Sequence, residues 1–255
     1  MNDLQNLYLR KSFLKFYGYL ALMILSACSP KLQLSGSDKA LYPIHSELPK
    51  DQTLVDYYMP YKLRLDSMMK EVVAVSALEI SKGRPEGPLN NLMADAMADA
   101  GRSGNIPFDI AYTNYGGLRV PLPKGNIALY NVFELMPFEN MITTVQFSGT
   151  DMKQFFDYMA YMGGDPISGA TYKISNKKAL DIKINGQALD LNKTYRVLTS
   201  DYMANGGDGG AIFLKATGRK EYNIKLRDAL LMYMKKQNRE GKILNPGKDG
   251  RITVE

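Results

Sequence analysis

The order of the secondary-structure signals constrains the fold of this chain more than any other feature of its sequence. Apolar residues that alternate with polar ones predict strands, and apolar residues three or four positions apart predict helices. The predicted strands cover residues 72–80, 108–113, 141–148, 171–175, 179–186, 194–200 and 251–254. The predicted helices cover residues 53–72, 88–101, 130–136, 149–164 and 223–237. Because these elements follow one another without regular βαβ units, we expect an α+β fold with a mixed β-sheet flanked by helices.

Proline and glycine predict where several of these elements end or turn. Pro60 lacks a backbone donor and is expected to interrupt the first helix. Gly101 is expected to end the second helix. The dipeptide Asn185-Gly186 favours a tight hairpin turn between two strands. The glycines of "SDYMANGGDGG", residues 200–210, cost conformational entropy, so they require either a very tight turn or the close approach of a ligand to the backbone.

The N-terminal sequence has the pattern of an export signal. Three basic residues precede the apolar run "FYGYLALMILSAC" at residues 16–28, which is too short to span a membrane comfortably. The ending "LSAC" resembles a bacterial lipobox, in which the cysteine is lipidated and becomes the first mature residue. Cys28 is therefore predicted to carry a lipid anchor. A plain secretory signal or a buried free thiol is the alternative.

The chain then divides into three predicted segments. Residues 1–27 form a lipoprotein signal peptide, residues 28–52 form a tether rich in Pro, Ser and Lys, and residues 53–255 form one domain. Residues 29–37 contain no acidic run. We therefore expect an exported, membrane-anchored lipoprotein that faces the periplasm from the outer membrane of a Gram-negative bacterium.

The composition argues against several classes of chemistry. The net charge is +6, but no basic stripe is interleaved with aromatic residues, so nucleic-acid binding is not predicted. The chain has one histidine, His45, and one cysteine. Ser-His-Asp or Cys-His catalysis and zinc sites built on His and Cys are therefore not expected. Asp201 and Asp208 form the best carboxylate pair for a hard cation, but no metal or other cofactor is predicted for this chain.

Four short stretches carry residue types that bind ligands. They read "KGRPEGPLNNLMADAM" from Lys82, "TNYGGLR" from Thr113, "LMPFEN" from Leu135 and "SDYMANGGDGG" from Ser200. Arginine makes bidentate contacts to phosphate, glycine-rich loops let backbone N–H groups approach an anion, and aromatic rings stack on bases. Loops at strand ends are frequent ligand sites. The sequence thus favours a site for an aromatic, anionic ligand.

Together the four stretches resemble the C-terminal domain of the 5'-nucleotidase family. The family patterns read approximately "R-x-x-E-S-P-L-G-N-L-x-A-D-A", "N-G-G-G-I-R", "L-P-F-G-N" and "F-L-A-x-G-G-D-G". In this chain they stand in the same order, with similar spacing, as "RPEGPLNNLMADA", "NYGGLR", "MPFEN" and "YMANGGDGG". The resemblance extends from about Val72 to Gly210 and implies a domain that recognises nucleotides.

The resemblance assigns the base and the sugar to three residues. Phe138 and Tyr202 would sandwich the nucleobase, and Asp208 would hold the ribose hydroxyls. Tyr202 stands where the family pattern has phenylalanine, which adds a hydroxyl to a ring that stacks equally well. Taken alone, Phe138 after a proline is typical of a core residue, and Asp208 is typical of a turn.

The resemblance assigns the phosphate to a second group of residues. Arg84 and Arg119 would contact the phosphate, with Asn114 and the backbone near Gly117 beside it. Arg84 is one residue closer to the glutamate of its motif than in the family pattern. Tyr115 replaces a glycine and is expected to narrow the pocket. Taken alone, Arg119 is typical of a solvated surface arginine, and Asn114 of a cap or turn.

The resemblance also sets the functional hypotheses. The hydrolytic chemistry of the family resides in an N-terminal metallophosphoesterase domain with two metal ions, which this sequence is expected to lack, so the chain alone is expected to be inactive. The first hypothesis is the nucleotide-recognition subunit of a split 5'-nucleotidase, completed by a separate metallophosphoesterase chain that carries the divalent metals. The alternatives are a stand-alone nucleotide- or nucleoside-binding lipoprotein without catalysis, and a degenerate structural remnant.

Overall fold

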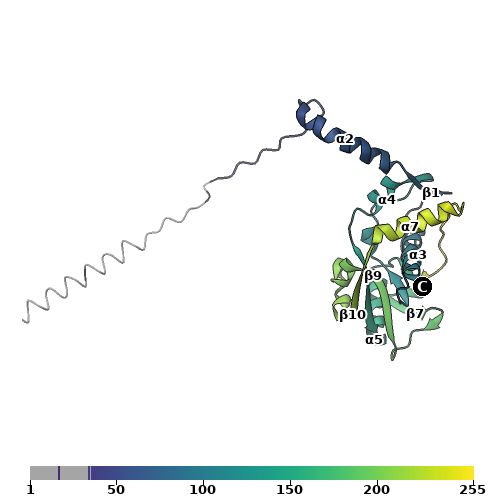
Figure 1. Ribbon diagram of the computed structural model, residues 1–255. Coiled ribbons are helices and arrows are strands. Elements are labelled where there is room, and N and C mark those ends of the chain that lie inside the picture. Colours follow the sequence, from purple (N-terminus) through teal and green to yellow (C-terminus); the bar gives the residue numbers. More distant parts are fainter. Residues whose placement is uncertain (1–16, 18–33, 35) are drawn as a thin grey trace, which may run out of the picture. The chain divides into compact units, whose positions relative to one another are not determined.

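The structure divides into two units. The computed structural model describes residues 17, 34 and 36–255 of the chain (Figure 1). Contacts between residues separate residues 1–51 from residues 52–255. The second unit contains every strand of the described residues and all the residues of the candidate site.

The first unit carries the predicted export features. Its residues 36–51 form no helix or strand, and their side chains are exposed, including that of His45. Cys28 and the predicted signal peptide apart from Tyr17 lie outside the described residues, so the lipid anchor stays a prediction. Among the residues that the structure describes, no helix is long and apolar enough to cross a membrane.

The second unit mixes helices and strands. Its α-helices are α2 (Gln52–Met69), α3 (Pro88–Ser103), α4 (Leu129–Leu135), α5 (Gly149–Tyr161), α6 (Asp201–Ala204) and α7 (Leu226–Arg239). Its strands are β1 (Val72–Ser76), β2 (Ile110–Tyr112), β3 (Gly125–Ala128), β4 (Met141–Ser148), β5 (Ile167–Ser168), β6 (Ala170–Ser175), β7 (Lys178–Ile184), β8 (Gln187–Ala188), β9 (Thr194–Ser200), β10 (Thr217–Lys225) and β11 (Ile252–Val254). Short 3₁₀ turns are η1 (Tyr115–Gly117), η2 (Gly207–Gly209) and η3 (Ala211–Lys215).

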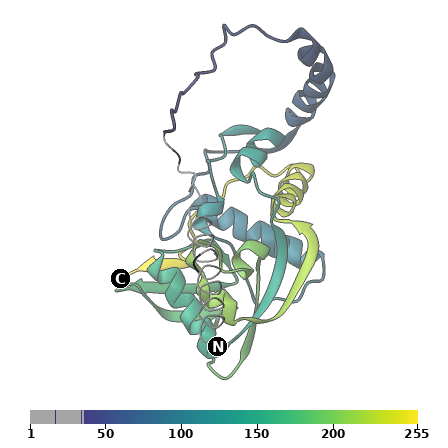
Figure 2. The same ribbon diagram turned by 90° about the vertical axis from the view of Figure 1, so that its left-hand side faces the viewer.

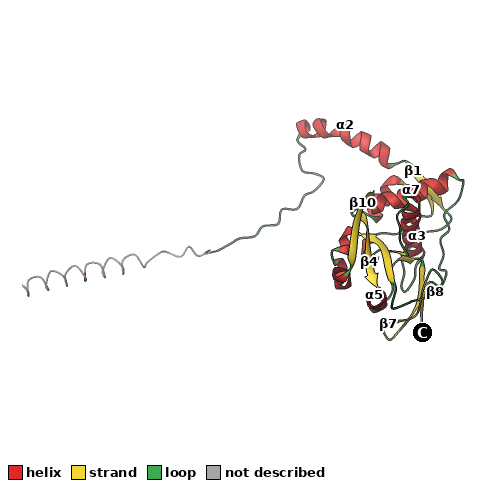
Figure 3. Cartoon of the chain, turned by 60° about the horizontal axis from the view of Figure 1, so that its bottom comes forward, coloured by secondary structure: helices red, strands yellow, loops and turns green. Residues whose placement is uncertain are grey.

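The strands form mixed sheets flanked by helices, as the sequence predicted (Figure 3). The largest sheet has the strand order β10-β4-β9-β2-β5. In this sheet β2 and β9 are parallel, and the other neighbours are antiparallel. A four-stranded sheet has the order β11-β6-β7-β8, and its C-terminal strand β11 runs parallel to β6 (Figure 2). β1 and β3 form a separate antiparallel pair.

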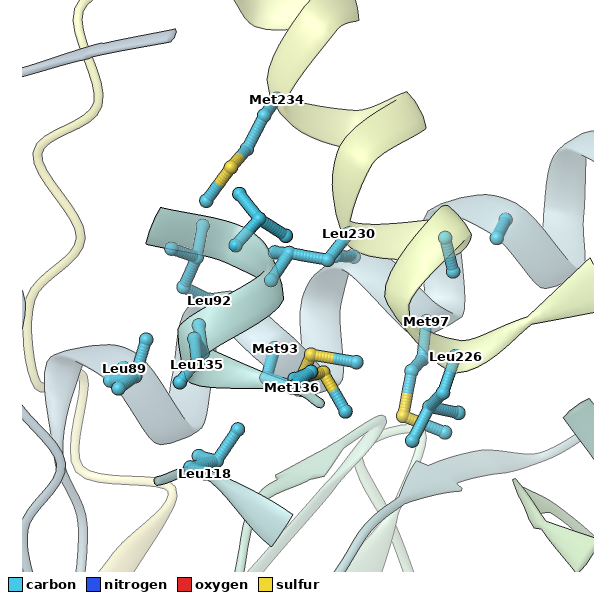
Figure 4. Packing of buried hydrophobic residues seen from close by; sticks show 14 of the residues in the cluster. Leu89, Leu92, Met93, Met97, Leu118, Leu135, Met136, Leu226, Leu230 and Met234 are labelled. Atoms are coloured by element: carbon cyan, nitrogen blue, oxygen red, sulfur yellow. The ribbon is translucent and has the colours of Figure 1, made fainter. Parts of the chain in front are cut away.

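The inner strands β4, β9 and β2 of the large sheet are buried on both faces, because residues of β9 alternate between two hydrophobic cores. In β9, Leu198 belongs to the core built by α3, α4 and α7, whereas Val197 belongs to the core built around α5. Figure 4 shows the first core, where Met93 of α3, Leu135 of α4 and Leu230 of α7 converge. A sheet packed on two sides holds its strand ends in fixed positions, which prepares a rigid base for loops.

The structure corrects three details of the predicted elements. α2 continues through Pro60 instead of being interrupted there. α3 continues through Gly101 to Ser103, because Gly101 serves close packing rather than termination: a Cβ at this position would lie 2.6 Å from the Phe108 ring. Four strands were not predicted: the short strands β3, β5 and β8, and β10, whose sequence "TGRKEYNIK" shows no apolar alternation. The Asn185-Gly186 hairpin turn is confirmed, with positive φ at both residues between β7 and β8.

Candidate functional site

Three loops of the second unit meet at one edge of the large sheet. β2 and β9 are parallel neighbours, so their C-terminal ends lie at the same edge. β4 is antiparallel to β9 and pairs Ile142 with Ser200, so β4 begins at that edge. The loop after β2, the loop before β4 and the loop after β9 therefore converge, although they are distant in sequence.

The converging loops enclose a cavity of about 480 Å³. This volume lies within the range of roughly 300–1,000 Å³ that is typical of small-molecule sites. The cavity is lined by Asn114, Gly116, Gly117, Arg119, Phe138, Glu139, Asn140, Tyr202 and Asp208. The structure thus brings together six of the seven residues predicted to bind substrate, and Arg84 is not among the lining residues.

The ring end of the cavity consists of Phe138, Tyr202 and Asp208. Phe138 is 38% exposed and Tyr202 is 41% exposed, so neither ring belongs to the core. The Tyr202 hydroxyl donates a hydrogen bond to Asp208 Oδ1 at 2.7 Å and accepts one from the Asp208 backbone N–H at 3.1 Å. A Cβ on Gly207 would lie 2.4 Å from the Tyr202 ring, so only glycine allows the ring to rest on this loop.

Asp208 connects the two glycine-rich loops. Its φ of 51° lies in the left-handed region, which aspartate tolerates better than most residues. Asn114 donates a hydrogen bond from Nδ2 to Asp208 Oδ2 at 2.6 Å, and the Tyr158 hydroxyl of α5 donates to the Asp208 carbonyl at 3.2 Å. Each carboxylate oxygen can accept a further hydrogen bond. Asp208 is therefore a fixed acceptor at the rim of the cavity.

A cationic cluster of Lys82, Arg84 and Arg119 surrounds the η1 turn. Lys82 Nζ lies 4.3 Å from the Tyr115 ring centroid and donates a hydrogen bond to the Leu118 carbonyl at 2.6 Å. Arg84 Cζ lies 4.4 Å from the same ring, and Arg119 Cζ lies 5.7 Å from the Phe138 ring. Burial lowers the pKa of Lys82, and the charges of Arg119 and Arg84 lower it further. Three cations in one place favour an anionic ligand.

Tyr115 has a different place from the one predicted. Its ring lies against Lys82 and Arg84 and is not among the residues that line the cavity. Arg84 also donates a hydrogen bond from Nη2 to Oδ1 of Asp165, at a distance of 3.4 Å. Arg84 is thus held beside the η1 turn by a ring on one side and a carboxyl group on another.

The residues present do not fit a metal site. Asp201 accepts a hydrogen bond from Asn140 Nδ2 at 3.1 Å, whereas Asp208 is bound by Tyr202 and Asn114. Across residues 17, 34 and 36–255, no group of three or more His, Cys, Asp or Glu side chains could hold a metal ion. We therefore assign no metal-dependent step to this site.

Comparison with known protein families assigns this chain to a family. The model of the "5'-nucleotidase, C-terminal domain" family matches residues 71–216, which is more than half of the chain. This chain belongs to the 5'-nucleotidase C-terminal domain family. The match covers the η1 turn, the loop before β4 and the loop after β9, so the whole cavity lies inside the 5'-nucleotidase C-terminal domain.

Individual relatives agree with this assignment. The chain is 26% identical to a 5'-nucleotidase of Vibrio vulnificus over 206 residues, which cover 75% of this chain and 35% of the relative. The crystal structure of a 5'-nucleotidase precursor from Thermus thermophilus is 26% identical, has a TM-score of 0.66, and is matched over 81% of this chain and 44% of that chain. The NAD nucleotidase of Haemophilus influenzae, 19% identical with a TM-score of 0.61, is matched over 80% of this chain and 41% of its own and shares the fold. The chain spans about a third of the length of the curated relatives it matches.

Sequence reasoning missed several residues of the nucleotidase-domain site. Glu139 and Asn140 line the cavity directly after Phe138, and their position in "LMPFEN" was the available signal. Glu139 forms ion pairs with Lys225 and Arg227, and hydrogen bonds from these two residues lower its pKa to about 2. Arg227 also donates hydrogen bonds to the carbonyls of Met136 and Phe138, so it fixes the backbone that presents the Phe138 ring.

Proposed function

We propose that this chain is the nucleotide-recognition subunit of a split 5'-nucleotidase. The observation that carries the proposal is the cavity itself, in which two exposed rings, a fixed carboxylate and a neighbouring cationic cluster lie together. The base would lie between Phe138 and Tyr202, and each ring would contribute about 1–3 kcal/mol by stacking. The ribose hydroxyls would donate to Asp208, and the phosphate would lie toward Arg119.

Bond breaking is assigned to a separate metallophosphoesterase chain. In such a partner, two divalent metal ions would activate water for in-line attack on phosphorus and release a nucleoside and phosphate. This chain would bind and orient the nucleotide, with Arg119 next to the phosphate and the rings holding the base. Correct orientation of a bound substrate contributes a large part of the rate of many reactions.

The location of this subunit is also part of the proposal. The lipobox-like ending at Cys28 supports an exported lipoprotein at the periplasmic face of the outer membrane. Labelling of cells with a radioactive fatty acid would give a labelled wild-type chain and an unlabelled Cys28→Ala variant. Label in both chains would exclude Cys28 as the anchor.

One observation favours a second candidate function. Residues of this chain alone hold the carboxylate of the cavity in place, since Asn114 and Tyr202 both donate hydrogen bonds to Asp208. A site that is preorganised in this way suits a stand-alone nucleotide- or nucleoside-binding lipoprotein. The two candidates differ in whether a metallophosphoesterase partner is needed for function.

A pair of measurements tests both candidates. Calorimetric titration of the full chain with AMP and adenosine measures binding without a partner, and Tyr202→Ala is expected to weaken both ligands. Hydrolysis of AMP by a purified metallophosphoesterase is then measured with and without this chain. Faster hydrolysis in the mixture supports the split enzyme. Binding without any effect on hydrolysis supports the stand-alone protein. Absence of binding together with an unchanged rate of hydrolysis contradicts both candidates.

A further inference from the structure

A buried carboxyl group lies behind the candidate site. Asp165 follows α5, precedes β5, and is 2% exposed. Its Oδ2 accepts a hydrogen bond from the Tyr112 hydroxyl at 3.0 Å, and its Oδ1 accepts one from Arg84 Nη2 at 3.4 Å. Arg84 is the cation paired with it, and this contact is long for a charge-assisted hydrogen bond. The carboxyl group is thus held in place but only weakly neutralised.

The groups around Asp165 come from several elements of the fold. Burial raises the pKa of Asp165 to about 6, whereas the Arg84 charge and the Tyr112 hydrogen bond lower it. The neighbouring titratable or charged groups are Arg84 before α3, Tyr112 of β2, Tyr158 of α5, Tyr172 of β6 and Asp208 of η2. Among them only Arg84 carries a positive charge. Loss of Arg84 as a partner would therefore leave a buried carboxylate without a counter-ion, which is costly.

This carboxyl group is connected to two of the three loops of the cavity, the loop after β2 and the loop after β9. Arg84, its partner, is stacked on Tyr115, and Tyr115 begins the η1 turn whose glycines line the cavity. Tyr158 is a neighbour of Tyr112 and contributes to the raised pKa of the Tyr112 hydroxyl. Tyr158 also donates a hydrogen bond to the Asp208 carbonyl. Arg84 does not line the cavity itself, but its side chain is 33% exposed and lies beside the η1 turn whose glycines do, so an anionic group that extends past this turn can reach it.

We propose that Asp165 is a positioning residue of this site: it holds Arg84 beside η1 while the site is empty, and it takes up a proton when an anionic ligand group engages Arg84. The proton comes from the solvent, Arg84 keeps its charge, and the ligand anion replaces the carboxylate as the partner of the guanidinium. This inference rests on the proposed function, because it names the residue that adjusts Arg84 to an anionic nucleotide.

The proposal has a definite pH dependence. Binding of an anion raises the proton affinity of Asp165, so by linkage a falling pH must strengthen the binding of that anion. The phosphate of AMP titrates in the same range. The probe is therefore adenosine 5'-sulfate, whose single negative charge is constant from about pH 5 to about pH 8. Adenosine, which carries no anion, is the internal control for the ring end.

The experiment is calorimetric titration of the full chain with both probes between about pH 5 and about pH 8. In the wild type, we expect the affinity for adenosine 5'-sulfate to rise about fivefold or more toward the lower pH, while the affinity for adenosine stays constant. Titrations in two buffers of different ionisation heat measure the number of protons taken up with the sulfate. Asp165→Asn should bind both probes with no pH dependence and no proton uptake.

Control variants and contrary outcomes complete the test. Asp181→Asn removes an exposed aspartate paired with Lys173 and should behave as the wild type. If Asp165→Asn fails to fold, Arg84→Gln gives the same test, because proton uptake needs the guanidinium partner. Equal pH dependence in wild type and Asp165→Asn, or none in the wild type, would overturn the inference while adenosine binding still supported the proposed function. Failure of both probes to bind at every pH would overturn the proposed function as well.

Discussion

At the ring end of the cavity, Phe138 and Tyr202 keep more than a third of their surface open. In the cationic cluster, by contrast, Lys82 and Arg84 are stacked on the Tyr115 ring, and Arg84 is tied to the buried Asp165. The ring end is ready for a ligand, whereas part of the cationic cluster is occupied by groups of the protein itself. Binding at the ring end therefore requires little rearrangement, whereas an anion must compete with Asp165 for Arg84.

Replacement of Tyr202 by alanine tests the ring end most strongly. Tyr202→Ala should weaken the binding of adenosine and AMP by about tenfold to a hundredfold, because one stacking face is lost. Tyr202→Phe keeps the ring and should retain most of the affinity. Tyr161→Ala, which removes another exposed tyrosine ring outside the cavity, is the matched control in the same titrations. Equal losses of affinity for AMP and adenosine would locate the effect at the base. A loss of affinity for AMP alone would contradict the distinction between the ring end and the cationic cluster.

The second prediction concerns the free energy of unfolding, which burial of Asp165 beside the cationic cluster should lower. Because burial raises the pKa of Asp165 in the folded chain from its ordinary value of 3.8 to about 6, the stability of the wild type must fall as pH rises between these values. Urea unfolding should therefore show Asp165→Asn gaining about 2 kcal/mol relative to the wild type between about pH 4 and about pH 7. A constant difference between the two chains would mean that burial of Asp165 carries no such cost.

Replacement of Gly207 tests whether the position of the Tyr202 ring matters for binding. Gly207→Ala places a Cβ against the ring, so the ring must shift and adenosine binding should weaken about fivefold. The free energy of unfolding should change little, since φ at this residue is not positive. Gly247→Ala, at a glycine with open space around it, is the control. Unchanged adenosine affinity in Gly207→Ala would show that the position of the Tyr202 ring is unimportant.

The smallest expected effect concerns the ring between the cations. Tyr115→Leu removes two cation–π contacts, each of about 0.5–1 kcal/mol at an exposed site, and frees Lys82 and Arg84. Adenosine binding should be unchanged, while AMP binding should change by about threefold, as measured by titration. An equal change for both ligands would indicate that Tyr115 shapes the whole cavity, and the two regions would then not be separable.

The residues of the ring end could be selected from the sequence because they lie in short local motifs, and the structure places them in one cavity. Phe138 and Tyr202 stand within three residues of a strand end, and Asp208 follows in the loop after β9, where loops carry function on a rigid base. The fold class could be predicted for a related reason, since most strands and helices have clear periodicity. β10 escaped prediction because it is an edge strand held by pairing with β4, and its own sequence lacks a periodic pattern.

The sequence did not predict the environment of the cationic cluster, because its contacts join distant segments. Asp165 lies 81 residues from Arg84, and the stretch "GGDPIS" carries no motif that indicates a buried acid. Lys82 is close to Arg84 in sequence, but its contact with the Leu118 carbonyl depends on how the η1 turn is folded. Tyr115 was expected to narrow the cavity, and only the packing of its ring against two cations shows where the side chain goes.

The contact between Gly207 and the Tyr202 ring also limits how many bases can stack on that ring. A Cβ on Gly207 would lie 2.4 Å from the Tyr202 ring, so the loop passes close to the ring on the side of Gly207 and leaves no room there for a stacked base. Single-stranded polynucleotides bind by threading successive bases onto successive open rings. Phe138 and Tyr202 line the same cavity of about 480 Å³. Under the proposed function, such a cavity would therefore hold one base rather than a run of successive bases.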